Sequence, residues 1–386
     1  MRRHTAGIRT LLAAAGVLFP VLGVVVSGCG EKIAIPEPTG VFSLNQYVAL
    51  DTFTTTGMAM QLSQGRGALF VLTADSLSKR DTRFGLIEQV GGFADPRSLC
   101  LDENADYVFV WENDAQRVSW FDAGTLDPVG FTVLPDVQTV VAMATNPEGI
   151  DQVPGASTYL YLSDPVSGVI HRYAFTDGSG LTPFGILTRD GGEGVRFVLE
   201  AAGMATDSEN YLLVCDADTT RNWVLRFAST PDPGDTSPDP DDPDPMRGFA
   251  ALFDTASCEP PATTDYVIGN AAECQETDWV GGPSSEEGEF YANSDVAVDG
   301  LGRIFVADTE NNRIQQFTSN GLYEIQFICS EPGFGPTSLG LFDEDGSQPG
   351  VIDYGAYLFM TLKDSDKVVQ FISYDHYQTI FGELPL

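Results

Sequence analysis

The sequence predicts an all-β fold in which a unit of four short strands repeats along the chain, and three observations support this prediction. The stretch DVAVDGLGRIFVADTENNRIQQF (295–317) holds two apolar runs joined by a glycine-containing turn, then a polar loop and a third strand. Related stretches recur about every forty residues where no insertion intervenes, a period typical of the four-stranded blades of a β-propeller. No long amphipathic helix pattern interrupts residues 29–386, and the 40 glycines and 23 prolines suit a chain rich in turns.

The unit defined by residues 295–317 recurs most clearly in residues 98–131, which match it in order with almost no gaps. Weaker copies occupy residues 140–175, 203–227 and 338–371, and a first copy shows only its opening two strands, in residues 57–73. These six copies predict a six-bladed β-propeller of four-stranded antiparallel blades. A seven-bladed ring and a different repeat class are the alternatives.

The composition of the strands agrees with this architecture. The runs YVFVW (107–111), YLYLS (159–163) and YLLVC (211–215) are largely apolar on both faces. A sheet with two apolar faces cannot bury both alone, whereas sheets arranged radially cover one another and leave only short edges.

At this point the sequence resembles a known family. Residues 295–317 are similar to an NHL repeat, which has an AVD strand, a G-N-I-Y-V-A-D strand and an N-N-R-I-Q strand, and residues 288–290 match the G-x-F that precedes it. A looser resemblance extends over residues 57–381 and implies a six-bladed propeller of the NHL or TolB-like type. Blades one, three and six lack the AD-x-x-N-N-R signature.

The N-terminus is typical of an export signal. Three arginines precede an apolar run that ends in Val-Ser-Gly-Cys at Cys29, and this order resembles a bacterial lipobox. The resemblance implies that residues 1–28 are a lipoprotein signal peptide, that Cys29 is lipidated, and that residues 29–40 tether a propeller spanning residues 41–386. An ordinary signal peptide and an N-terminal anchor helix are the alternatives.

The lipid anchor would hold the protein at the membrane, in the periplasm or at the cell surface. The residue after Cys29 is Gly30 and not Asp, so the sorting rule for such lipoproteins favours the outer membrane if the host has one.

The charge balance limits the partners. The chain has 20 basic and 55 acidic residues, a net charge of −35, and residues 1–28 contribute three arginines and no acid. So acidic a chain is not expected to bind nucleic acid.

The cysteines divide into two groups apart from Cys29. Cys258 and Cys274 lie in a stretch without strand pattern and are candidates for a disulfide, which export permits. Cys100 and Cys215 lie inside apolar runs and are expected to be small buried side chains.

Two inserted loops interrupt the repeat. Residues 231–245 (PDPGDTSPDPDDPDP) are acidic and proline-rich and are expected to be a solvated linker. Residues 256–287 form a second loop, which contains the cysteine pair, and residues 249–253 between the two loops are expected to form the fourth strand of blade four. The acidic loops are candidates for no more than weak Ca²⁺ binding, and we expect no other cofactor.

Loops between second and third strands are expected to share one rim of the propeller, and their polar side chains form a candidate binding surface. Turn formation by Asp and Asn is the stronger interpretation of the same residues. The candidate rim residues are Glu112, Asn113, Arg117, Asp218, Arg221, Asp308, Asn311, Asn312, Arg313, Lys363 and Asp364.

Three functions are compatible with these features. The leading hypothesis is a lipid-anchored, non-catalytic envelope propeller that binds a protein, peptide or glycan. The second is an enzyme of the lactonase or lyase type with a metal in the central tunnel. For this, the sequence offers only His171 and His376 after the signal, with no metal-ligand spacing and no catalytic residue to name. The third is a structural component of a surface assembly.

Overall fold

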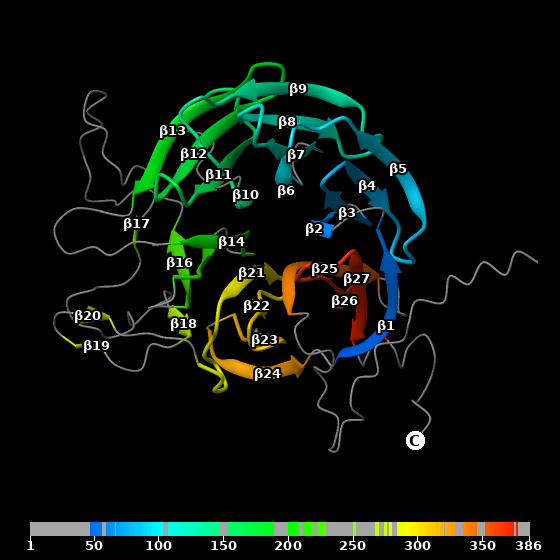
Figure 1. Ribbon diagram of the computed structural model, residues 1–386, viewed down its shortest axis with the longest axis vertical. Coiled ribbons are helices and arrows are strands. Elements are labelled where there is room, and N and C mark those ends of the chain that lie inside the picture. The colour runs from blue at the N-terminus through cyan, green and yellow to red at the C-terminus, as the bar shows by residue number, and fades with distance from the viewer. Residues whose placement is uncertain are drawn as a thin grey trace, which may run out of the picture.

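The computed structural model describes seventeen segments of the 386-residue chain. They are residues 47–55, 59–65, 67–102, 107–146, 153–188, 200–207, 211–218, 222–228, 250–251, 267–269, 274–275, 278–279, 284–319, 321–328, 335–345, 352–373 and 376. These residues contain 27 strands, most of them in six antiparallel sheets set around a common axis (Figure 1). No helix in these segments is long and apolar enough to cross a membrane.

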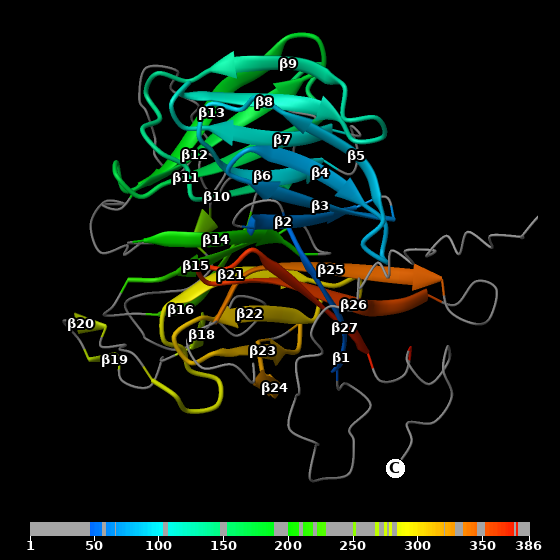
Figure 2. The same cartoon turned by 45° about the vertical axis from the view of Figure 1, so that its right-hand side comes forward.

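The first three blades each consist of four consecutive strands, ordered from the axis outward (Figure 2). Blade one comprises β2 (Ala59–Gly65), β3 (Ala68–Thr73), β4 (Ser76–Arg80) and β5 (Leu86–Gly91). Blade two comprises β6 (Pro96–Asp102), β7 (Tyr107–Glu112), β8 (Arg117–Asp122) and β9 (Pro128–Val133). Blade three comprises β10 (Ala142–Asn146), β11 (Thr158–Asp164), β12 (Val169–Thr176) and β13 (Gly180–Thr188).

The remaining blades vary this pattern. Blade four comprises β14 (Ala201–Thr206), β15 (Leu212–Asp216), β16 (Trp223–Ala228), β17 (Ala250–Ala251) and β18 (Val267–Gly269). Blade five comprises β21 (Asn293–Val298), β22 (Ile304–Asp308), β23 (Arg313–Phe317) and β24 (Tyr323–Ile328). Blade six comprises β25 (Pro336–Asp345), β26 (Ile352–Leu362), β27 (Lys367–Ser373) and β1 (Tyr47–Thr54). The strands β19 (Cys274–Gln275) and β20 (Asp278–Trp279) pair only with each other.

The six-bladed prediction is therefore confirmed. The first strands form an inner ring in which β2, β6, β10, β14, β21 and β25 each contact the next, and β25 contacts β2.

The ring closes through the two ends of the propeller. The N-terminal strand β1 pairs antiparallel with β27 from Tyr47↔Ser373 to Thr54↔Lys367, so it supplies the outer strand of the last blade. The sequence analysis did not predict this pairing. It joins the first and last described strands in a single sheet and therefore resists opening of the ring.

The core is divided among the junctions between blades. The buried apolar residues fall into six clusters, and each cluster draws on two adjacent blades. All seven residues of β11 are buried, as both faces of this strand are covered by neighbouring blades. Cys100 and Cys215 are buried in two of these clusters, as predicted.

The acidic loop 231–245 and most of the loop 256–287, with Cys258, lie outside the described residues, as do residues 1–46. The predicted fourth strand in residues 249–253 corresponds to β17, which pairs with the end of β16. The sequence analysis expected residues 256–287 to form a loop. The structure instead places the strand β18 within them, and β18 pairs with the beginning of β16. The outer edge of β16 is thus covered by two short strands, one on each side of the undescribed residues 252–266.

The closure can be tested at Tyr47. Its ring is 7% exposed and lies edge-to-face against Phe305 at 5.8 Å and Phe327 at 5.2 Å, so β1 also contributes to the junction of blades five and six. We expect Tyr47→Ala to lower the free energy of unfolding by about 3 kcal/mol, the range for deletion of a large buried side chain. Urea unfolding followed by tryptophan fluorescence measures this change.

A matched control is Leu322→Ala, because Leu322 is 68% exposed and its loss should change stability by no more than about 0.5 kcal/mol. Equal unfolding midpoints for the two variants would show that β1 does not stabilise the ring.

Candidate functional site

The candidate surface is the rim on which the loops between second and third strands meet the connections from one blade to the next. We call this the loop rim. In blade two, Asn113 N donates to Asp95 O at 2.9 Å, and in blade five Glu310 N donates to Tyr291 O at 3.1 Å. In blade six, Lys363 N donates to an oxygen of the preceding connection at 2.8 Å. These bonds confirm that the two kinds of loop lie side by side.

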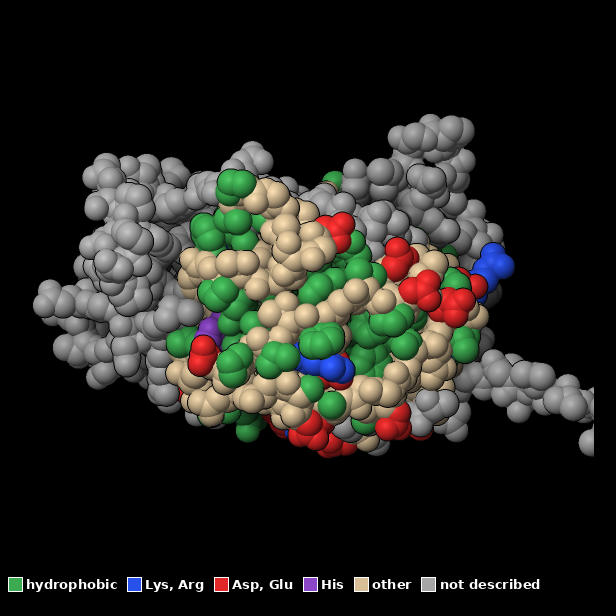
Figure 3. Space-filling view, turned by 90° about the horizontal axis from the view of Figure 1, so that it is seen from above, with side chains coloured by type: hydrophobic (Ala, Val, Ile, Leu, Met, Phe, Trp, Pro, Cys, Tyr) green, Lys and Arg blue, Asp and Glu red, His purple; other side chains and the backbone are tan. Residues whose placement is uncertain are grey.

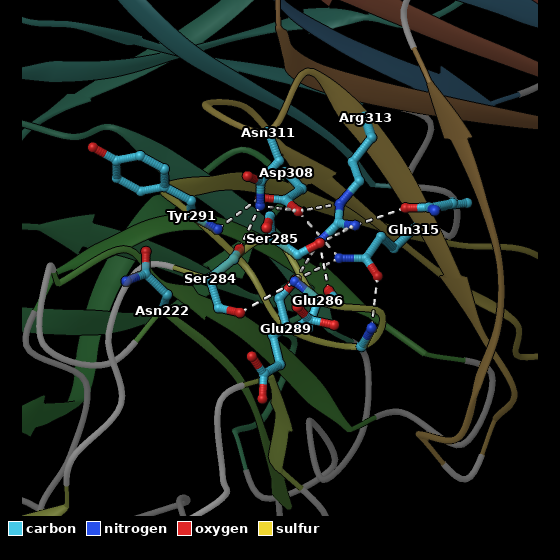
Figure 4. A network of polar contacts seen from close by, with 12 residues as sticks. Asn222, Ser284, Ser285, Glu286, Glu289, Tyr291, Asp308, Asn311, Arg313 and Gln315 are labelled. Atoms are coloured by element: carbon cyan, nitrogen blue, oxygen red, sulfur yellow. Dashed lines mark hydrogen bonds and ion pairs between the residues drawn. The ribbon is translucent and has the colours of Figure 1, made fainter.

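In blade five, the loop rim is organised by a buried ion pair (Figure 4). Asp308 ends β22 and Arg313 begins β23, and Arg313 Nε donates to Asp308 Oδ2 at 2.6 Å with both side chains buried. The other carboxylate oxygen accepts the backbone N–H of Tyr291 at 2.7 Å, in the connection that leads into β21. The side-chain amides of Asn311 and Gln315 also donate to this carboxylate.

The remaining donors of Arg313 hold the same connection. Its guanidinium donates to the backbone oxygens of Ser285, Glu286 and Glu289 at 2.7 to 2.9 Å, and to Gln326 Oε1 at 2.7 Å. Burial raises the pKa of Asp308, and its hydrogen-bond donors and the Arg313 charge partly oppose that rise. The arginine therefore neutralises a buried carboxylate and fixes the chain entering the blade.

Blade two contains a second version of this arrangement. Arg117 donates to both oxygens of Glu112 at 2.8 and 2.9 Å, and Ala94 N and Ser119 Oγ donate to the same carboxylate. Although burial alone would raise the pKa of Glu112, these hydrogen bonds together bring it below its ordinary value. Ser119 occupies the third-strand position that Gln315 occupies in blade five, two residues after the arginine.

In blades three and four, the carboxylate is kept and the arginine is replaced. Asp164 ends β11 and is fully buried, but β12 begins with Val169. The third-strand position of Ser119 holds His171, whose Nε2 lies 4.0 Å from Asp164 Oδ2. Burial lowers the pKa of His171, although nearby acidic groups oppose this.

The carboxylates of Asp164 in blade three and Asp216 in blade four also accept backbone N–H groups. Gln138 N donates to Asp164 Oδ2 at 2.9 Å, again from a blade-to-blade connection. In blade four, Asp216 ends β15 and accepts Glu200 N at 2.9 Å, while β16 begins with Trp223. In four blades, therefore, the carboxylate that ends the second strand accepts a backbone N–H of the connection leading into the blade, and we call this bond the tie. The arginine is present in only two of these four blades.

The residue before the third strand has a left-handed backbone in the same four blades. The φ angles are 44° at Gln116, 70° at Gly168, 52° at Asn222 and 57° at Asn312. Glycine and asparagine adopt this conformation more readily than most residues. The turn therefore favours an asparagine at the second Asn of the N-N-R motif, Asn312.

The predicted rim residues accordingly differ in their availability. Glu112, Asp308 and Arg313 are buried in the ties described above, and Asn113 accepts a bond from Thr139 Oγ1 at 2.7 Å. Lys363 and Asp364 lie at the surface, and Lys363 pairs with Glu310. The side chains of Arg117, Asn311, Asn312 and Asp218 are half-buried, and Arg221 lies outside the described residues.

Sequence reasoning missed a second set of side chains, exposed or half-buried, at the axial end of the loop rim. The pairing of first with second strands shifts at one residue near the start of the strand in blades one, two, four, five and six. In the last four of these blades, where side-chain burial is described, each extra residue is exposed or half-buried and the residue after it is buried. A β-bulge re-aims a side chain in this way. These axial bulge residues are Arg97, Ala202, Ser294 and Thr337.

The axial bulge residues offer hydrogen-bonding groups near the axis. Arg97 donates to Asp95 Oδ2 from Nε at 3.0 Å and from Nη2 at 2.9 Å, with about half of its side chain exposed. Ser294 Oγ donates to Pro336 O at 3.2 Å, and Thr337 and Thr361 share a hydroxyl–hydroxyl bond at 2.8 Å. This set combines one cation with two hydroxyls, which suits the binding of a polar ligand.

On the opposite rim, aspartates at the ends of first strands form turns. Asp299 Oδ1 accepts the backbone N–H groups of Leu301 and Arg303, and Arg303 Nε donates to Oδ2. Asp207 accepts Tyr211 N and pairs with the buried Arg226. Within the described segments, no three His, Cys, Asp or Glu side chains are grouped to hold a metal ion.

Asp295 is a buried carboxyl beside the axial bulge residue of blade five. It accepts the backbone N–H of Leu339 in β25 at 2.8 Å and that of Val296 at 2.9 Å. On the other side it meets β14, where a Cβ at Gly203 would lie 2.5 Å from the Asp295 Cα. Burial raises the pKa of Asp295 to about 7, although its hydrogen bonds oppose the rise. This carboxyl therefore lies where blades four, five and six meet.

Comparisons with known proteins agree with the repeat. The model of the NHL repeat matches residues 294–317. No curated protein matches the chain in sequence. A solved structure titled as that of a streptogramin B lyase is 13% identical, with 83% of this chain and 96% of that chain covered and a TM-score of 0.45. A virginiamycin B lyase from Staphylococcus aureus is 11% identical, with 85% and 99% covered and a TM-score of 0.46.

The tie of blade five can be tested by removing its cation. We expect Arg313→Met to lower the free energy of unfolding by about 3 kcal/mol, because it leaves the buried Asp308 carboxylate without its counter-charge. Lys363→Met removes the cation of an exposed pair with Glu310 and should change stability by less than about 1 kcal/mol. Urea denaturation compares the two, and a similar small effect of both changes would contradict the structural role of Arg313.

The buried Asp295 should make the free energy of unfolding depend on pH. Its pKa is about 7 in the folded chain and near 3.8 in the unfolded chain, so between these values the folded state holds the extra proton. Stability from this group should fall by about 1.4 kcal/mol per pH unit as pH rises from about 4 to 7, and level off above. Asp295→Asn should remove this slope in urea titrations at pH 5, 6, 7 and 8. An unchanged slope would show that another group is responsible.

Proposed function

We propose that this protein is a lipid-anchored β-propeller of the bacterial cell envelope, in which the loop rim and its axial bulge residues bind a protein, peptide or glycan without catalysis. The observation that carries this proposal is that the loop rim holds two kinds of polar side chain, which differ in their availability to a ligand. Its buried carboxylates are occupied in tying loops to connections, whereas Arg97, Ser294 and Thr337 present polar groups near the axis.

The chemistry of these groups favours binding over reaction. The guanidinium of Arg97 is a hydrogen-bond donor and has no acceptor. Ser294 and Thr337 bond to other oxygens, and no base activates either hydroxyl within the described residues. Such a surface recognises carboxylates, carbonyls and sugar hydroxyls. An enzyme of the lactonase or lyase type with a tunnel metal, and a structural role in a surface assembly, are the competing proposals.

The anchor rests on the sequence alone. Arginines, an apolar run and Val-Ser-Gly-Cys end at Cys29, and residues 29–46 precede the first described strand. If extended, these 18 residues would reach about 60 Å, enough to keep the propeller clear of the lipid surface.

The proposal can be tested in two steps with the full chain. Cys29→Ala should move the protein from the membrane fraction to the soluble fraction, and equal retention would contradict the lipid anchor. Ligands are then sought on arrays of peptides and glycans, with Arg97→Ala compared against Arg83→Ala, an exposed arginine on an outer turn. We expect Arg97→Ala alone to weaken binding, by about tenfold if one charged hydrogen bond is lost. Equal binding by both variants would place the ligand elsewhere.

A further inference from the structure

The outer strand of blade two carries an apolar strip. Val129, Phe131 and Val133 alternate along β9 and are 47%, 58% and 52% exposed. Their partners in β8 show that Phe131 and Val133 lie on the face that carries Arg117 and Ser119. The guanidinium of Arg117 stacks on the Phe131 ring at 5.0 Å, yet more than half of this ring stays exposed. Three large apolar side chains are thus left at the surface.

The strip is unlike the other outer strands whose side chains the structure describes. β5 also exposes two large apolar side chains, Leu86 and Ile87, but the polar Glu88 and Gln89 follow them. The exposed residue of β24 is Glu324, and the exposed residues of β1 are Asp51 and Thr54. Every exposed residue of β9 is apolar. Edge strands are normally protected from pairing by charges, prolines or bulges. In β9 these devices are confined to its start, where Pro128 and a bulge near Val129 lie, and residues 130–133 pair regularly with β8.

The outer edge of β9 is also open. In its sheet β9 pairs with β8 and has no other strand partner among the described residues. Figure 3 looks on to this end of the molecule, and hydrophobic side chains gather in its centre while acidic side chains lie mainly along its edges. An open strand edge with an apolar face is the surface that strand addition uses.

We propose that β9 pairs with β9 of a second copy of this chain, antiparallel and across a two-fold axis near Phe131. The sequence of the strand is close to palindromic about this residue: Val-Gly-Phe-Thr-Val occupies residues 129–133. An antiparallel pair centred on Phe131 sets Phe against Phe and Val against Val, which is the self-complementarity that a two-fold interface requires.

Charge favours the same occupant. The chain has a net charge of −35, so two copies repel each other over most of their surface. Residues 128–133 contain no acidic residue, so pairing of two copies within the strip sets no like charges opposite each other. The strip is far smaller than the roughly 800 Å² per partner of a stable interface. The dimer is accordingly weak and reversible, with a dissociation constant in the micromolar range or above.

The test uses the full chain, extracted in a mild detergent and studied by sedimentation velocity over a range of concentrations. The wild type should associate reversibly from monomer to dimer as its concentration rises. Phe131→Glu sets like charges opposite each other on the axis and should weaken association at least about tenfold. Leu322→Glu places the same charge at a residue that is 68% exposed on another blade, and it should associate as the wild type does. Urea midpoints of the variants verify folding.

Cross-linking in intact membranes gives an independent measurement. Phe131→Cys should form a disulfide-linked dimer under mild oxidation, and Leu322→Cys should not exceed the wild type, whose own cysteines give the background. A monomeric wild type up to about 100 µM, or equal cross-linking at both positions, would overturn the proposal, since micromolar affinity populates the dimer there. Without the proposed lipid anchor, in Cys29→Ala, loss of binding to phosphatidylcholine vesicles on adding Phe131→Glu would instead assign the strip to the lipid surface and overturn the proposal.

Discussion

The structure depends on one constraint: each blade is apolar on both faces and needs a neighbour on each side. The six hydrophobic clusters meet this need pairwise around the ring. A row of blades would leave two apolar faces open at its ends, and only closure covers them. Hydrophobic contact at the last junction is reinforced by the pairing of β1 with β27, which makes the ends of the propeller part of one sheet. Closure is thus maintained by backbone hydrogen bonds as well as by side-chain burial.

Once the ring is closed, the polar connections on the loop rim have to be held in place. A connection that leads into a blade has backbone N–H groups that need partners, and the carboxylate at the end of the second strand accepts one of them in blades two to five. Burying that carboxylate is costly without a cation or several donors. Arg313 and Arg117 supply the cation in blades five and two. Elsewhere, the backbone turn around Asp164 supplies donors, with His171 close by.

The sequence predicted what depends on local pattern. Strands such as residues 107–111 are apolar throughout, and their spacing gave the blades and their number. The turn role of Asn312 followed from its residue type. The pairing of β1 with β27 could not be predicted, because its partners are more than 300 residues apart and β1 contains the exposed Asp51 and Thr54. The burial of the predicted rim residues depends on the connections between blades, which carry no recognisable motif.

The axial bulge residues escaped prediction for a different reason. A bulge is set by the pairing of two strands and leaves no mark in the alternation of one strand. A bulge also lets one strand carry an accessible side chain directly before a buried one. Because the extra residue takes no part in the ladder and the next one is buried, Arg97, Ala202, Ser294 and Thr337 can differ in size and charge. The architecture that the blades share therefore imposes little on the chemistry at the axis. Repeat similarity identifies the scaffold, and the side chains at these bulges are where the binding that we propose would acquire its specificity.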